Sequence, residues 1–307
     1  MRDLKIKCGI SFLVLSFYIV ACFYSVYFVD ISSDTLHYLN NYNNIAQNPY
    51  PFGYELGLSI LMWLCSFVGM SFDWFLIATL MLWVPFIYVF TNRYVDNVVM
   101  LLSSLFFITP FFIENALFLI RNYVALSLFF SAMVVCGNLK RYTLLAMSVI
   151  THFSIIILVI LLSKHVYKLI LRNRTISWCL LSIAVLCMIF VTSSEIISII
   201  NLEVLKGVLP QDIYRKASFY NSANEYGAAN NMIILISIFA SVLVILNKSE
   251  TEYDMRFSTL VFAQCLICIA LSNVGILSNR LGIIGFLFSI PISCFYLSKL
   301  MKSKNEN

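Results

Sequence analysis

The chain has 307 residues, of which 61% are hydrophobic, 15% are aromatic and only 11% are charged. A soluble domain usually carries about 25% charged residues, so this composition excludes a water-soluble domain, a disordered tail and a nucleic-acid-binding module. The net charge of +5 is small and lies in short segments between apolar runs, which is typical of a protein oriented in a bilayer. We therefore predict an all-α, polytopic integral membrane protein with a single membrane domain over residues 1–307.

Ten apolar runs are candidate transmembrane helices. They cover about residues 8–29, 54–70, 72–90, 97–113, 116–136, 142–163, 176–193, 230–246, 257–274 and 280–298. Basic residues at both chain ends and in 164–174 favour cytoplasmic termini. With ten spans, the two longer polar segments, 30–53 and 194–229, are loops on the opposite side of the membrane.

One part of this topology stays open. Ten spans place Arg93, Lys140 and Arg141 outside, against the preference of basic residues for the cytoplasmic side. The order would change if residues 54–70 formed a re-entrant or interfacial segment and a second half-crossing lay around His152. Such interrupted segments are tolerated only where protein buries them or where they line a wet cavity.

The cysteines and histidines give no sign of a metal or redox site. The nine cysteines lie in or beside apolar runs, so we predict no disulfide framework. Cys265 and Cys268 stand one turn apart within a candidate span, where apolar packing is the expected role. With three histidines and no His/Cys cluster, we expect no metal and no other cofactor.

Ionisable residues in or beside apolar runs are costly in a bilayer and mark candidate functional sites. The informative ones are Glu55, Glu114, Arg121, His152 and Arg280. Glu114 and Arg121 are two turns apart, so we expect either an ion pair on one helix face or an arginine that grips an anionic group. Arg280 either extends its side chain to the membrane interface or, like Arg121, contacts an anionic group. His152 either bonds to a neighbour or carries a proton.

The two polar segments contain groups suited to sugars and phosphates. Asp34, Tyr38 and Tyr42 are spaced by four and share one face of a short predicted helix. This face suits sugar recognition, or an amphipathic helix at the membrane interface. In the second segment, Arg215 and Lys216 lie near Tyr220 and several amides, which is typical either of a lid over a polar cavity or of a solvated loop.

The order of these motifs resembles the EpsG-like and Wzy-type polysaccharide polymerases (O-antigen polymerases). The matching segments are Ser33-Asp34 with Tyr38 and Tyr42, Glu55-Leu-Gly57, Ile120-Arg121-Asn122 with Ala125, His152-Phe-Ser154, the Tyr-rich second loop, and Asn279-Arg280. Asn122 departs from the pattern, because the family usually has glutamine there. No Walker A, GxSxG, HExxH or GxGxxG motif is present, which agrees with a donor that carries its own activation.

The resemblance implies a lipid-linked glycosyltransferase of the bacterial inner membrane with both long loops in the periplasm. Its partners would be undecaprenyl-diphosphate-linked oligosaccharide repeat units, membrane lipid and a chain-length regulator protein, and nucleic acid is not among them. From charge, we expect Arg121 and Arg280, helped by Arg215 and Lys216, to stabilise the diphosphate leaving group. His152 or Asp34 would be the base. We place Tyr38, Glu55, Glu114 and Tyr220 among the substrate contacts.

Other functions remain open from the sequence. A flippase for the same lipid-linked oligosaccharide would line a path with its charges, although such transporters often show internal repeats and none is visible here. A membrane acyltransferase would use His152 on an acyl donor. A ligase that transfers finished glycan would differ from a polymerase in its acceptor only.

Overall fold

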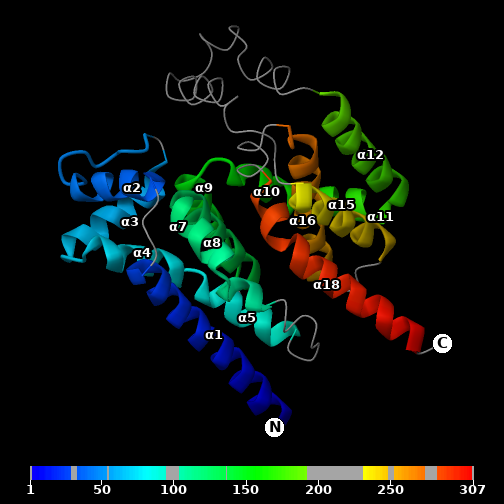
Figure 1. Cartoon of the computed structure of the whole chain (residues 1–307), viewed down its shortest axis with the longest axis horizontal. Helices are drawn as coiled ribbons and strands as arrows, with labels where there is room; N and C mark the ends of the chain where they lie inside the picture. The colour runs from blue at the N-terminus through cyan, green and yellow to red at the C-terminus, as the bar shows by residue number, and fades with distance from the viewer. Residues whose placement is uncertain are drawn as a thin grey trace. The chain divides into compact units, whose positions relative to one another are not determined.

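The computed structural model describes residues 2–28, 33–53, 55–94, 104–135, 137–191, 231–247, 252–273 and 282–305 (Figure 1). The regular structure in these ranges is helical, and no strand occurs in them, so the all-α prediction is confirmed for this part of the chain. The chain divides into two compact units, Met1–Val159 and Ile160–Asn307, and each is described by itself. A single membrane domain remains a prediction.

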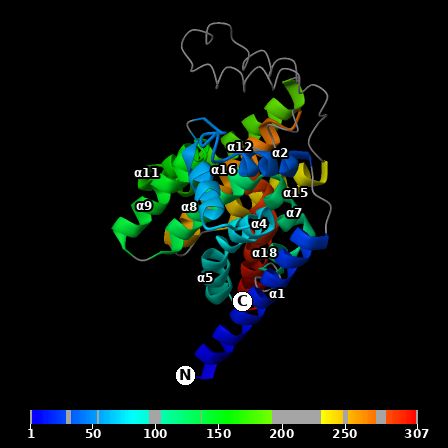
Figure 2. The same ribbon diagram turned by 90° about the vertical axis from the view of Figure 1, so that its left-hand side faces the viewer.

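The first unit contains nine α-helices and one 3-10 helix within its described residues. They are α1 (Arg2–Phe28), α2 (Ser33–Asn43), α3 (Leu56–Phe67), α4 (Phe72–Met81), α5 (Val84–Tyr94), η1 (Leu105–Ile108), α7 (Pro110–Phe118), α8 (Ile120–Val134), α9 (Asn138–Thr151) and α10 (Ile155–Leu161), the last of which ends in the second unit. Helix α1 lies along α4 and α5, as both views show (Figures 1 and 2), and α8 packs along α9.

Interhelical hydrogen bonding and aromatic packing stabilise this unit. The Tyr18 hydroxyl of α1 donates to the Leu80 carbonyl of α4 at 2.8 Å, a type of bond that fastens helices where apolar burial alone gives little preference. The same unit contains a fully buried aromatic cluster. Its rings are those of Trp83, Phe86, Phe107, Phe112, Tyr123 and Phe130, with neighbouring centroids 4.7–6.2 Å apart. The cluster fixes α8 against α5 and α7, which matters for the site because α8 carries one of its residues.

In the second unit, the helices α15, α16 and α18, whose bounds follow, pack against one another (Figure 1). Its described helices are α11 (Lys164–Arg172), α12 (Arg174–Phe190), α15 (Asn231–Leu246), α16 (Glu252–Ala270) and α18 (Ile283–Asn305). A Cβ at Gly285 of α18 would lie 2.5 Å from the Cys265 backbone nitrogen of α16, so glycine permits this close approach. Cys265 and Cys268 are fully buried, as apolar packing requires.

Two described helices are long and apolar enough to cross a membrane, Cys8–Phe28 and Phe72–Asn92. A third span results if the bent pair α7 and α8 counts as one. Shorter apolar helices cover Leu56–Phe67, Arg174–Phe190, Asn231–Leu246 and Leu287–Leu297. These helices fit a membrane protein, and the number of ten spans stays a prediction.

Candidate functional site

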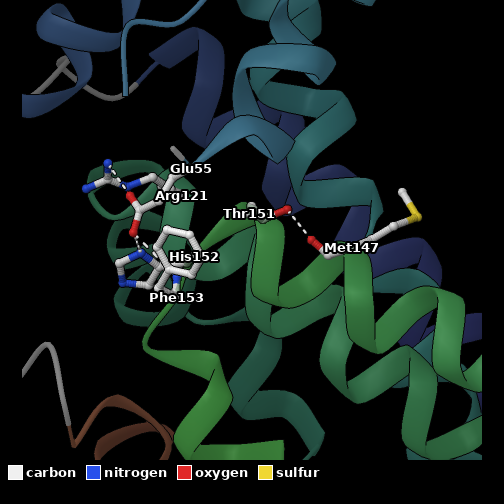
Figure 3. Close-up of polar contacts among 6 residues, drawn as sticks. All are labelled: Glu55, Arg121, Met147, Thr151, His152 and Phe153. Atoms are coloured by element: carbon white, nitrogen blue, oxygen red, sulfur yellow. Dashed lines mark hydrogen bonds and ion pairs between the residues drawn. The ribbon is translucent and has the colours of Figure 1, made fainter. Parts of the chain in front are cut away.

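Three helix ends of the first unit meet at one point. Glu55 immediately precedes α3, Arg121 lies in the first turn of α8, and His152 directly follows α9. Figure 3 shows their side chains converging, with the Glu55 carboxylate between the guanidinium and the imidazole. Because helix ends leave backbone groups without partners inside the helix, such junctions are where polar groups can gather within an apolar bundle.

The Glu55 carboxylate joins the other two side chains. Arg121 Nη1 forms an ion pair with Glu55 Oε2 at 2.7 Å, and His152 Nδ1 lies 2.8 Å from Glu55 Oε1. The backbone N–H of Phe153 also donates to Oε1 at 3.4 Å. Glu55 therefore fixes a cation and a histidine while it accepts a backbone N–H at the break between α9 and α10.

Burial differs among the three in a way that suggests separate roles. The Glu55 side chain is 5% exposed, whereas the side chains of Arg121 and His152 are each 19% exposed. A ligand would therefore reach the arginine and the histidine before the carboxylate. The carboxylate is placed to hold these two groups, and its negative charge offsets the positive charge of the buried part of Arg121.

Gly57 explains how α3 comes close enough to α9 for this contact. A Cβ at Gly57 would overlap the Thr151 hydroxyl and lie 2.8 Å from the Thr151 Cα. The same hydroxyl donates to the Met147 carbonyl at 2.7 Å (Figure 3), so it is not free to turn away without losing a bond. The Glu-x-Gly segment therefore combines a carboxylate with the small residue that brings it to His152.

Gly57→Ala is expected to separate α3 from α9. The added methyl group meets backbone as well as side chain, so a change of Thr151 alone does not relieve it, and such overpacking costs about 1–3 kcal/mol. We expect a lower melting temperature for the purified protein and a loss of activity beyond that caused by instability. Gly9→Ala is the matched control, because nothing lies within 4 Å of a Cβ there. An active, wild-type-stable Gly57→Ala protein would contradict this packing.

Of the two arrangements expected for Arg121, the ion pair with Glu114 is wrong, and the contact with an anionic group stays a prediction. The chain bends by 112° between α7 and α8, so the two residues do not share the face of a continuous helix. Glu114 is exposed on α7, and Arg121 pairs with Glu55 instead. The Thr35 hydroxyl of α2 donates to the Leu117 carbonyl at 3.1 Å, which satisfies a backbone group at this bend.

The run over 142–163 is likewise not one continuous helix. Helix α9 ends at Thr151, His152 adopts an extended conformation, and α10 starts at Ile155. His152 was expected in the interior of an apolar span, and the structure places it at a break. An interruption around His152 was one of the two topologies left open above, and whether it is a half-crossing stays open.

An aromatic ring adjoins the arginine, and a second ring packs against the first. The Arg121 guanidinium carbon lies 5.2 Å from the centroid of the Phe52 ring, and the Tyr38 ring centroid lies 5.7 Å from that of Phe52. Both rings are half-buried. Tyr38 was predicted to contact substrate, whereas Phe52 was missed. Its only signal in the sequence is an aromatic residue between Pro51 and Gly53 in an otherwise polar segment.

Tyr42 has a structural role. Its side chain is buried, its hydroxyl donates to the Met70 carbonyl at 2.7 Å, and its ring packs on Phe72 and Phe75. Burial, with a smaller contribution from Cys65, raises the pKa of Tyr42, which keeps the hydroxyl protonated as a donor. Tyr42 therefore anchors α2, and Tyr38 is the tyrosine of this helix that adjoins the site.

The structure does not test the roles predicted for several other site residues. Arg215, Lys216, Tyr220 and Arg280 lie outside the described residues. Asp34 belongs to the first turn of α2, which contacts α3 and α7. The roles expected for these residues remain predictions.

The converging residues come from three of the segments that carry the family resemblance, namely Glu55-Leu-Gly57, Ile120-Arg121-Asn122 and His152-Phe-Ser154. The sequence profile of the EpsG family matches residues 10–307, which is nearly the whole chain. The chain belongs to the EpsG family. The resemblance to EpsG-like polymerases is thereby confirmed, and it supports a membrane protein with a polysaccharide-polymerase-like function. Neither the curated proteins nor the solved structures contain a match to this EpsG-family chain.

Proposed function

We propose that this EpsG-family protein is a polysaccharide polymerase of the O-antigen type, a glycosyltransferase that joins undecaprenyl-diphosphate-linked repeat units at the periplasmic side of the inner membrane. The observation that carries the proposal is the buried Glu55 carboxylate shared by Arg121 and His152. It provides a fixed cation for an anionic leaving group beside a histidine suited to accept a proton.

Arg121 is the group that we assign to the diphosphate. As the glycosidic bond breaks, its electron pair goes to the diphosphate oxygen, and a fixed cation in a water-poor site stabilises that charge. The guanidinium stays charged when partly dehydrated and offers several donors to phosphate oxygens. One donor, Nη1, is engaged by Glu55, while the buried Nε has no hydrogen-bond partner among the residues described. The Arg121 side chain is 19% exposed, so part of it remains accessible to an anion.

His152 is the group that we assign to the acceptor hydroxyl. An ionised carboxylate only accepts hydrogen bonds, so the nitrogen that faces Glu55, Nδ1, carries the proton. Nε2 is then the acceptor nitrogen, and it points away from Glu55 in Figure 3. It would take the hydroxyl proton as the acceptor oxygen bonds to the anomeric carbon, in the way that a carboxylate-held histidine serves as a base elsewhere. This arrangement favours His152 over Asp34.

His152→Gln is expected to slow polymerisation by about 10²–10⁴-fold, the usual contribution of a general base. Binding of the lipid-linked donor should change little, because Arg121 and Glu55 remain. The rate is measured on lipid-linked repeat units with purified protein, and donor binding is measured separately on the same sample. His165→Gln, at an exposed position of α11, is the control. A normal rate in His152→Gln would rule out the base that we assign.

The function itself is tested by deleting the gene in its bacterium and separating the surface lipopolysaccharide or capsule on a gel. A ladder that collapses to core plus one repeat supports the polymerase, because units are still made, flipped and ligated. Loss of every repeat-bearing band would instead indicate a flippase or a ligase. An unchanged ladder would contradict all three and favour the acyltransferase.

A further inference from the structure

Beside the Arg121 guanidinium, the rings of Phe52 and Tyr38 form an aromatic pair that the chemistry above does not use. Phe52 lies in the turn over residues 51–53, shortly before α3, and Tyr38 lies on α2. The guanidinium stands over the Phe52 ring with 5.2 Å between its carbon and the centroid, and the two ring centroids are 5.7 Å apart with the planes tilted by 52°. We call Tyr38 and Phe52 the aromatic pair.

The aromatic pair is not part of the apolar core. Both rings are half-buried, whereas the rings of the aromatic cluster around Trp83 are fully buried. These two rings keep part of their surface accessible, and Phe52 does so in contact with the Arg121 guanidinium. Partial exposure beside a cation is the arrangement expected of a ligand contact, since an apolar ring surface and a charged group must both be reached.

The position of the pair relative to Arg121 specifies what it would contact. In a sugar diphosphate, one oxygen atom separates the anomeric carbon from the nearer phosphorus. A diphosphate held by Arg121 therefore brings its first sugar to the side chains around the guanidinium. The C–H face of a pyranose ring is apolar, and burying it against an aromatic ring is favourable.

We infer that Tyr38 and Phe52 form the subsite for the sugar attached directly to the diphosphate of the donor. This inference rests on the proposed function, because it takes Arg121 as the diphosphate contact. It adds a residue, Phe52, that makes the site prefer a glycosylated lipid diphosphate to the bare one. The bare lipid diphosphate is the product, so the same contact favours product release after transfer.

The test compares two probes, undecaprenyl diphosphate and undecaprenyl-diphosphate N-acetylglucosamine, on the full-length protein in lipid nanodiscs. Dissociation constants are measured for wild type, Phe52→Ala, Phe52→Trp and Arg121→Gln. We expect wild type to bind the sugar-bearing probe more tightly. Phe52→Ala should raise the dissociation constant of that probe by about three- to ten-fold, the size of one aromatic contact. The dissociation constant of the bare lipid diphosphate should stay unchanged. Phe52→Trp keeps an aromatic face and should retain the preference.

Two results would overturn the sugar subsite while the proposed function stands. In the first, wild type shows no preference for the sugar-bearing probe. In the second, Phe52→Ala weakens both probes equally, which would mean that Phe52 acts only through the guanidinium. A different result would contradict the proposed function and the subsite together: neither probe binds, or Arg121→Gln binds both as wild type does. Melting temperatures of the same samples identify a variant that has failed to fold; if Phe52→Ala does so, Phe52→Leu, which keeps an apolar side chain of similar volume without an aromatic face, replaces it and should show the same selective loss.

Discussion

Arg121→Gln is expected to abolish polymer formation, with a rate at least about 10³-fold below that of wild type. The change removes the fixed positive charge that faces the leaving diphosphate, and the loss of a single preorganised donor already costs about 10²–10³-fold in comparable sites. Arg121→Lys keeps the charge but loses the planar fork, so it should recover only a small part of the rate. The measurement is the initial rate on lipid-linked repeat units with purified protein, together with the surface polysaccharide of complemented cells.

The control for this prediction is Arg174→Gln. Arg174 begins α12 in the second unit, is exposed and donates to the Leu246 carbonyl at 3.3 Å. Its replacement removes the same charge from the chain without touching the site, and activity should stay near wild type. Equal activity of Arg121→Gln and Arg174→Gln would mean that no anionic group depends on Arg121.

Glu55→Gln is expected to lower both stability and activity. Glu55 is 5% exposed and is the partner of Arg121, so its loss leaves a largely buried guanidinium charge without compensation, which costs about 3–5 kcal/mol in comparable cases. His152 also loses the anion that orients its ring and stabilises its protonated form. The free energy of unfolding and the polymerisation rate are measured on the same detergent-solubilised protein.

A second substitution separates these two effects. In Glu55→Gln/Arg121→Gln the uncompensated charge is gone, so most of the lost stability should return, while activity should remain absent. Glu114→Gln is the matched single control for stability, because Glu114 is an exposed glutamate of α7 in the same unit. If the double variant were no more stable than Glu55→Gln, the ion pair would not be the source of the loss.

The residues of the site could be identified from sequence more readily than their partners. Glu55, Arg121 and His152 stand out because ionisable groups are costly among apolar runs and because each lies in a segment shared with the family. The pairing of Arg121 with Glu114 followed from assuming one continuous helix. The chain bends by 112° at Leu119, where the sequence has neither proline nor glycine to indicate a helix break. Helical periodicity therefore predicted Glu114 as the partner of Arg121 in place of Glu55.

Two further features depend on tertiary packing and are invisible in a one-dimensional pattern. Gly57 stands out in the sequence as part of the Glu-x-Gly segment, but its packing role is seen only where α3 contacts Thr151 of α9. Phe52 lies in a turn without periodicity, and only the fold brings it beneath the guanidinium of a residue 69 positions later. Element type was predictable from composition, because an apolar chain in lipid must satisfy its backbone within helices.

The most direct test of the central claim is reconstitution of the purified protein in liposomes with undecaprenyl-diphosphate-linked repeat units and no nucleotide. The products are separated and identified by mass spectrometry. The account predicts dimers and longer chains of the repeat unit, with one undecaprenyl diphosphate released for each bond formed, and no such products from Arg121→Gln. Repeat units that remain unjoined with the wild-type protein, whether or not they cross the bilayer, would contradict it.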